Sequence, residues 1–184
     1  DNDMIPESKS TIISLIDLQE RLCGAIERSK EILPRIKILL EGAKTLGIPV
    51  VATEQYPQGL GATLPELKEI LPPDTAFLSK TSFSCFGTED YRKELAKMSK
   101  GALVLVGVES HVCVLQTAID AASRGYEVYV PEDCVASRRE SDQTAALAFM
   151  RSSGIHIVTS EMLLFMLLRD ASHPDFKTIS KIIR

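Results

Sequence analysis

The feature that most constrains the fold of this 184-residue chain is a regular alternation of short β-rich runs with longer helical stretches. The run 102–107, ALVLVG, is apolar on both faces, as a central strand of a parallel sheet is. Residues 29–47 place apolar side chains at spacings of three and four, which predicts a helix that ends at Gly47. This alternation predicts a parallel sheet with helices on both faces. We expect further strands at 11–17, 48–54, 75–80, 126–133 and 154–160, and further helices at 89–98, 111–124, 137–150 and 161–170.

The composition, 45% hydrophobic and 25% charged, is typical of a folded globular protein with one core. We therefore expect one domain over residues 1–184, with a flexible tail at 1–10. Residues 55–74 are rich in proline and glycine and show neither a helical nor a strand period. A stretch of this length in a compact domain is usually functional. We interpret it as a segment that covers a substrate, and the alternative is a surface excursion.

Charge and apolar runs limit the classes of partner. The formal net charge is −4 and the chain holds no basic block, which disfavours nucleic acid and anionic membranes as partners. No apolar run approaches the roughly 18 residues that cross a bilayer. The amino-terminal residues also lack the apolar core of a secretory signal. We therefore expect a small-molecule substrate or a protein partner.

Cysteines and histidines form no pattern of a metal site or a disulfide framework. The four cysteines are scattered without a CxxC pair, which fits the cytoplasm or another reducing compartment. The three histidines lie far apart and lack the spacing of metal ligands. The stretch after the first expected strand supplies one glycine rather than GxGxxG, so a dehydrogenase is excluded. We expect neither a metal nor another cofactor.

Three reactive side chains fall where strands of the expected sheet end. Asp17 ends the first strand, Lys80 ends the third, and Cys113 follows 102–107 in the first turn of a helix. Because ligands bind at the carboxyl ends of parallel strands, these groups are expected to meet in one cleft. A helix amino terminus and an ammonium group would lower the pKa of the thiol and favour the nucleophilic thiolate. Asp17 would shuttle its proton. The alternative is an ordinary ion pair beside a buried cysteine.

The chain resembles the isochorismatase-like cysteine hydrolases, in the branch of isochorismatase domain-containing proteins. Three motifs of that superfamily stand here in the same order: LIDLQE, LSKTSFS and GVESHVC. The stretch TEQYPQGLGATLPEL adds to the resemblance, which covers the chain from about Thr11 to its end. It implies a three-layer α-β-α, Rossmann-like fold with a six-stranded parallel sheet in the order 3-2-1-4-5-6.

The resemblance also implies a site. The catalytic triad would be Asp17, Lys80 and Cys113, and the bond between Val108 and Glu109 would be a cis peptide. This turn would aim the backbone amides of Glu109 and Cys113 at an oxyanion. Relatives commonly form dimers or higher assemblies, and the stretch 161–170 is apolar on most faces, so a homo-oligomer is expected.

Five further residues are expected to contact the substrate. Gln19 and Gln55 would donate hydrogen bonds, Tyr56 and Phe83 would wall an apolar pocket, and Ser110 would line it. The histidine-rich metal site of nicotinamidases has no counterpart in residues 52–64, which disfavours that activity.

The presence of Cys113 in the expected triad favours attack on an amide or ureido C–N bond through a thioester. Two alternatives stay open. One is a true isochorismate hydrolase, which cleaves a vinyl ether without a cysteine nucleophile. The other is a non-catalytic or redox-sensing interaction module on the same fold.

Overall fold

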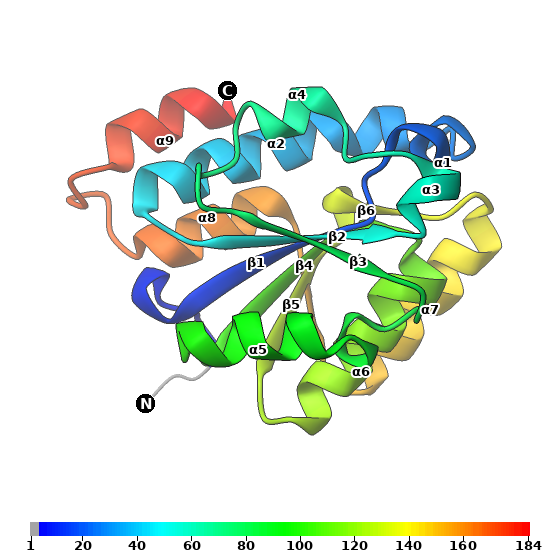
Figure 1. Ribbon diagram of the computed structural model, residues 1–184. Coiled ribbons are helices and arrows are strands. Elements are labelled where there is room, and N and C mark those ends of the chain that lie inside the picture. Colours follow the sequence, from blue (N-terminus) through cyan, green and yellow to red (C-terminus); the bar gives the residue numbers. More distant parts are fainter. Residues whose placement is uncertain (1–3) are drawn as a thin grey trace.

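The computed structural model describes residues 4–184 as a parallel β-sheet between two layers of helices (Figure 1). Six strands follow the order β3-β2-β1-β4-β5-β7, and β6 pairs with β4; all these pairs are parallel. The predicted α/β class and strand order are confirmed. The strands are β1 (Thr11–Ile16), β2 (Val50–Gln55), β3 (Ala76–Lys80), β4 (Ala102–Val108), β5 (Glu127–Pro131), β6 (Val135–Ala136) and β7 (His156–Val158).

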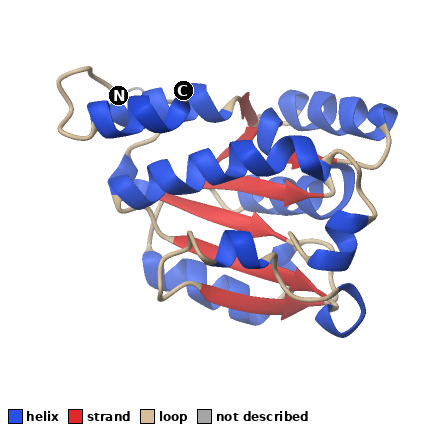
Figure 2. Cartoon of the chain, turned by 90° about the horizontal axis from the view of Figure 1, so that it is seen from above, coloured by secondary structure: helices blue, strands red, loops and turns tan. Residues whose placement is uncertain are grey.

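Helices cover both faces of the sheet (Figures 1 and 2). Helices α2, α8 and α9 pack over one apolar cluster, and α5, α6 and α7 pack over the other. Side chains of the central strands therefore meet a helix layer on either face. The helices are α1 (Glu20–Gly24), α2 (Ser29–Leu46), α3 (Pro57–Leu60), α4 (Pro65–Lys68), α5 (Glu89–Met98), α6 (Leu115–Ser123), α7 (Glu140–Ser152), α8 (Ser160–Leu168) and α9 (Phe176–Ile183), and a π-helical turn, η3 (Ser110–Val114), precedes α6.

The two central strands, β1 and β4, are buried along their whole length. Their residues pair in register from Thr11 with Ala102 to Ile16 with Gly107. Side chains of β1 alternate between the layers: Ile13 lies in the cluster under α2, and its neighbour Ile12 lies in the opposite cluster. Because the strands are parallel, the residues that follow them emerge at one edge of the sheet.

Helix α2 illustrates how local sequence sets an element's end. Its buried side chains recur at spacings of three and four and face the sheet. Gly47, with φ of 72°, closes the helix in the left-handed conformation, and its amide donates to the Lys44 carbonyl. The end predicted at this glycine is confirmed.

Three expectations need correction. The sheet has seven strands rather than six, because the two-residue β6 pairs with the end of β4 and is too short to show a period in sequence. The stretch 55–74 contains two short helices, α3 and α4. Helix α7 begins at Glu140, not at Ser137, and its N-cap is Arg139. Ser137 does not cap this helix because it is buried and its hydroxyl bonds to His111 Nδ1 at 2.8 Å.

The expected tail at 1–10 falls partly outside the described residues, which begin at Met4. Ser8–Ser10 form a 3₁₀ turn that leads into β1. The Tyr129 hydroxyl donates to the Met4 carbonyl at 2.8 Å. Within residues 4–184, no helix is both long and apolar enough to span a membrane.

Candidate active site

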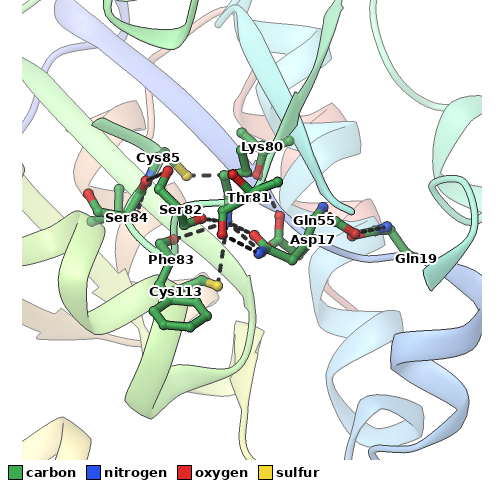
Figure 3. Close-up of polar contacts among 12 residues, drawn as sticks. Asp17, Gln19, Gln55, Lys80, Thr81, Ser82, Phe83, Ser84, Cys85 and Cys113 are labelled. Atoms are coloured by element: carbon green, nitrogen blue, oxygen red, sulfur yellow. Dashed lines mark hydrogen bonds and ion pairs between the residues drawn. The ribbon is translucent and has the colours of Figure 1, made fainter. Parts of the chain in front are cut away.

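Asp17, Lys80 and Cys113 meet at the carboxyl edge of the sheet (Figure 3). Asp17 directly follows β1, Lys80 is the last residue of β3, and Cys113 lies in the turn after β4. The three residues are almost inaccessible to solvent, at 0%, 4% and 6% exposed respectively. The parallel sheet therefore brings together an acid, a cation and a thiol that are far apart in sequence.

The Lys80 ammonium is the centre of this cluster. Its Nζ lies 3.0 Å from Asp17 Oδ2, 2.6 Å from Gln55 Oε1 and 3.5 Å from Cys113 Sγ. It also lies 3.1 Å from the Ser82 carbonyl and 3.0 Å from the Phe83 carbonyl. An ammonium group carries three protons, so five acceptors compete for them. The thiol sulfur is the most distant acceptor.

The Lys80 side chain stays charged although it is buried. Burial lowers its pKa, but the Asp17 carboxylate and the neighbouring thiols raise it by more, so the net pKa lies above the ordinary value. The ion pair with Asp17 is inaccessible to solvent on both sides. Such a pair is retained at a desolvation cost, which is typical of functional sites.

Asp17 is held on both carboxylate oxygens. Lys80 donates to Oδ2, and the Thr53 hydroxyl donates to Oδ1 at 2.9 Å. Thr53 reaches it because this residue of β2 pairs in register with Ile16, the last residue of β1. Asp17 itself has φ of 54°, an uncommon backbone conformation for a residue other than glycine. Sequence reasoning missed Thr53, because strand register rather than a local pattern brings its hydroxyl to Asp17.

The turn from β4 to Cys113 packs closely against β1. Gly107 has φ of 126°, and a Cβ at this position would lie 2.0 Å from the Ile16 carbonyl oxygen, so only glycine fits. The Val108–Glu109 peptide bond is cis. Ser110–Val114 then form the π-helical turn that carries Cys113.

The expected lowering of the Cys113 pKa is wrong for the substrate-free protein. Burial raises the pKa of this thiol to about 12, and the Asp17 carboxylate adds to the rise through its charge and a hydrogen bond. The Lys80 ammonium opposes both but does not outweigh them. The resting group is therefore a thiol that hydrogen-bonds to the Asp17 carboxylate.

A second thiol, Cys85, backs the cluster. It is fully buried, and its sulfur lies 3.8 Å from the Thr53 hydroxyl that holds Asp17. Burial raises its pKa to about 11, with Lys80 opposing the rise. Its position between β2 and α6 fits a structural role.

The two expected glutamines form a rigid network beside the ion pair. Gln55 accepts from Lys80 and donates to the Thr81 carbonyl at 2.9 Å. Gln19 exchanges two hydrogen bonds with the Gln55 backbone, at 2.7 and 2.9 Å, and donates to the Gly61 carbonyl. These amide groups thus bind protein atoms in the substrate-free state.

Tyr56 and Phe83 are exposed at the mouth of the site, at 56% and 53% respectively. Tyr56 lines a surface cavity of about 340 Å³ that extends to Lys80 and Thr81. Phe83 sits on the turn whose carbonyl accepts from Lys80 (Figure 3). Tyr56 thus shares a cavity with Lys80, and Phe83 contacts Lys80 through its backbone carbonyl.

Glu109 and Ser110 occupy the turn before Cys113. The Glu109 carboxylate accepts from the Arg138 side chain at 3.1 Å and from the Arg138 backbone at 3.0 Å, away from the cluster. Ser110 is fully buried, and its hydroxyl has no hydrogen-bond partner among the described residues. His111 bonds to Ser137 rather than to Cys113.

The four cysteines are free thiols, and residues 4–184 place no group of three metal-ligating side chains together. The acid, cation and thiol are thus the chemical groups gathered at this edge.

Comparisons with known proteins place this chain in a family. The isochorismatase domain model matches residues 11–162. Isochorismatase domain-containing protein 2A of Mus musculus is 42% identical over 184 residues, covering 98% of this chain and 85% of that protein. The structure of MAR1 ribonuclease from Caenorhabditis elegans has 37% identity and a TM-score of 0.92, covering 97% of this chain and 91% of that chain.

The YcaC gene product of Escherichia coli, described as an octameric hydrolase of unknown specificity, has a TM-score of 0.85 at 24% identity. Its alignment covers 96% of this chain and 94% of that chain, and it is a likeness of fold alone. The family match, in contrast, spans all three residues of the buried cluster. This chain belongs to the isochorismatase domain family.

Proposed function

We propose that this protein is a cysteine hydrolase that cleaves a small amide or ureido C–N bond through a thioester on Cys113. The observation that carries the proposal is the Lys80 ammonium, which lies within hydrogen-bonding distance of both Asp17 and Cys113 in a buried cluster. No cofactor is required for this chemistry.

The first half-reaction forms the thioester. Asp17 takes the thiol proton, and the sulfur attacks the carbonyl carbon, so the C=O π electrons move to oxygen. The backbone amides of Glu109 and Cys113 donate to this oxyanion. When the C=O bond re-forms, the C–N bond breaks, and Asp17 returns the proton to the leaving nitrogen.

The second half-reaction releases the acid. Water attacks the thioester carbonyl, Asp17 accepts a proton from it, and the sulfur leaves and recovers that proton. Lys80 keeps Asp17 oriented and stabilises the sulfur whenever it carries negative charge. The raised pKa of Cys113 supports proton removal during attack rather than a preformed thiolate.

Amide, hydroxyl and aromatic side chains around the cluster are available for contact with a substrate. Both amide protons of Gln19 are donated to protein carbonyls, so Gln19 must exchange a partner to donate to a substrate. The Gln55 amide donates one of its two protons to Thr81, which leaves the second for a substrate. Tyr56, Phe83 and the unpartnered hydroxyl of Ser110 are the side chains that we assign to substrate contact.

Two other activities are less favoured. A structural relative is called a ribonuclease, but the net charge of −4 here does not favour binding to RNA phosphates. Hydrolysis of a vinyl ether, as in isochorismatases proper, does not need the cysteine. The intact Cys113 beside Asp17 and Lys80 favours the amide reaction instead.

A panel of primary amides and ureido acids tests the proposal through release of ammonia. We expect turnover by the wild-type protein and loss of turnover in Cys113→Ser and Asp17→Asn. Vinyl ether and RNA are assayed in parallel. Turnover that Cys113→Ser retains, on any of these substrates, would contradict a thioester mechanism.

We also propose that the protein forms a homo-oligomer. Met162 and Phe165 of α8 are about half exposed, and Phe165 lines an apolar hollow with Phe176 of α9. The octameric state described for the YcaC gene product is a precedent within this fold. Light scattering on a sizing column measures the mass, and a Phe165→Glu variant should dissociate the assembly.

A further inference from the structure

We propose that Thr117 and Asp120 of α6 are positioning residues that fix the loop 81–86 against the helix carrying Cys113, and so set the distance between Lys80 and the thiol. This inference rests on the proposed function, because it assigns the groups that hold the same site in shape. It concerns residues outside the triad and outside the substrate contacts described above.

Two hydrogen bonds join α6 to the loop. The Ser84 hydroxyl donates to Asp120 Oδ2 at 2.6 Å, and the Cys85 amide donates to Thr117 Oγ1 at 3.0 Å. The bond between Cys85 and Thr117 is buried, and the bond between Ser84 and Asp120 is partly buried. Both partners on α6 are side-chain oxygens, and both partners on the loop are donors.

The spacing along the helix aligns these contacts with the nucleophile. Thr117 lies four residues after Cys113, and Asp120 lies three residues after Thr117. This spacing places all three on one face of the turn η3 and the helix α6. The face that presents the thiol to Lys80 thus also binds the loop. No other residue named in the site sits on this face of α6.

The other side of the same loop holds the Lys80 ammonium. The carbonyls of Ser82 and Phe83 accept from Nζ at 3.1 and 3.0 Å (Figure 3). The Ser82 hydroxyl donates to the Ser84 carbonyl at 2.8 Å, which ties this part of the loop to the part bound by Asp120. The chain of contacts runs from Asp120 through Ser84 and the loop carbonyls to Lys80.

This series of contacts affects the distance between Lys80 and the Cys113 sulfur. The ammonium has more acceptors than protons, and the Cys113 sulfur is its most distant acceptor, at 3.5 Å. If the loop carbonyls shifted slightly, the ammonium would therefore lose its contact with the sulfur before it lost its contacts with the nearer acceptors. Asp120 and Thr117 prevent that shift by binding the loop to the helix that carries the sulfur.

The test measures the second-order rate constant for alkylation of Cys113 by iodoacetamide, followed by intact mass and peptide mapping across pH 7–10. We expect Asp120→Ala and Ser84→Ala to lower this rate constant at least fivefold, with the double variant no slower than either single one. Asp120→Asn should stay within twofold of wild type, because its amide oxygen still accepts from Ser84. Gln116→Ala, an exposed position on α6, is the matched control.

Thr117 gives an independent arm. Thr117→Val removes the acceptor for the Cys85 amide and should lower the rate constant, whereas Thr117→Ser should restore it. Hydrogen exchange of the 81–87 peptide should speed up only in the variants that slow alkylation. If Asp120→Ala does not fold, Ser84→Ala decides the matter, since it removes the same bond from the loop side.

Rate constants for Asp120→Ala or Ser84→Ala that are within twofold of wild type, or above it, overturn the inference. So does an equal loss in Asp120→Asn, because that would indicate a role of the charge rather than of the hydrogen bond. Alkylation needs no substrate, so this result stands apart from the proposed function. A wild-type protein that alkylates at Cys113 but hydrolyses no amide would contradict the proposed function alone.

Discussion

Cys113 and Cys134 are both buried at the carboxyl edge of the sheet, but they lie in apolar clusters on opposite faces. Burial raises the pKa of both thiols above the ordinary value, and an adjacent aspartate adds to the rise. Only Cys113 has an ammonium group within hydrogen-bonding distance, whereas Cys134 contacts Asp133 at 3.7 Å.

The aspartates differ as well. Both oxygens of Asp133 accept from Ser160 at the start of α8, at 2.6 and 2.8 Å, so this carboxylate holds a helix end. Asp17 is bound to Lys80 and also accepts from Cys113. The two thiols thus share burial and a nearby acid, and they differ in the Asp17–Lys80 ion pair that contacts Cys113 alone of the two.

The largest expected difference between the two thiols is in catalysis. Cys113→Ser should lower kcat/KM for an amide by at least about 10³-fold, because hydroxyl is a far weaker nucleophile than thiolate. Cys134→Ser should change it by less than about threefold. Steady-state rates of ammonia release measure both values. Similar losses in the two variants would remove the distinction.

The second difference concerns the buried ion pair. Lys80→Ala leaves the Asp17 carboxylate buried without its cation, so the free energy of unfolding should fall by about 3–5 kcal/mol. Lys37 makes an exposed pair with Glu66 of the same length, 3.0 Å, and Lys37→Ala should cost less than about 1 kcal/mol. Urea unfolding measures both, and equal costs would contradict the special role of burial.

A smaller effect is expected at the threonine that completes the Asp17 site. Thr53→Val removes the donor to Oδ1 and should lower the free energy of unfolding by about 1.5–3 kcal/mol, the range for hydrogen bonds to charged groups. Thr53→Ser should recover most of it. Thr45→Val, at an exposed hydroxyl, is the control and should stay within about 0.5 kcal/mol. A Thr53→Val cost as small as the control's would remove Thr53 from the site.

The smallest effect is on the pH dependence of stability. A raised pKa means that the folded protein keeps the Cys113 proton at pH values where the unfolded chain loses it. The resulting stability is fully present below pH 9.0, the ordinary thiol value, and is lost as pH rises through about 12. Between these pH values, one such thiol lowers the free energy of unfolding by about 1.4 kcal/mol for each pH unit of increase.

Between pH 9 and pH 10.5 the free energy of unfolding should therefore fall less steeply with pH in Cys113→Ser than in the wild type. The difference between the two slopes should be up to about 1.4 kcal/mol per pH unit. Urea titrations of the wild type and the variant at four pH values give the two slopes. An unchanged slope would mean that the thiol is already ionised in the folded protein.

Sequence periodicity predicted the main strands and helices because their apolar residues recur with clear periods. Asp17, Lys80 and Cys113 were predictable because residues that end parallel strands must share one edge. The partners of these groups were not predictable in the same way. Thr53 and Asp120 reach the site through strand register and helix packing, which no local pattern encodes.

The direction of the Cys113 pKa was predicted wrongly for a similar reason. The sequence suggested a helix amino terminus and an ammonium, both of which lower a thiol pKa. It did not give the depth of burial or the closeness of Asp17, and these outweigh Lys80. Burial is a property of the packed structure, so its cost appears only once the fold is known.

In the proposed mechanism, Cys113 carries the acyl group during turnover. The most direct test is intact mass spectrometry of wild-type protein quenched in acid while it hydrolyses an amide from the panel, followed by peptide mapping. We predict an added mass equal to the acyl part of the substrate, located on Cys113 and lost when substrate is exhausted. Turnover without any adduct on Cys113, together with undiminished turnover in Cys113→Ser, would contradict the thioester mechanism.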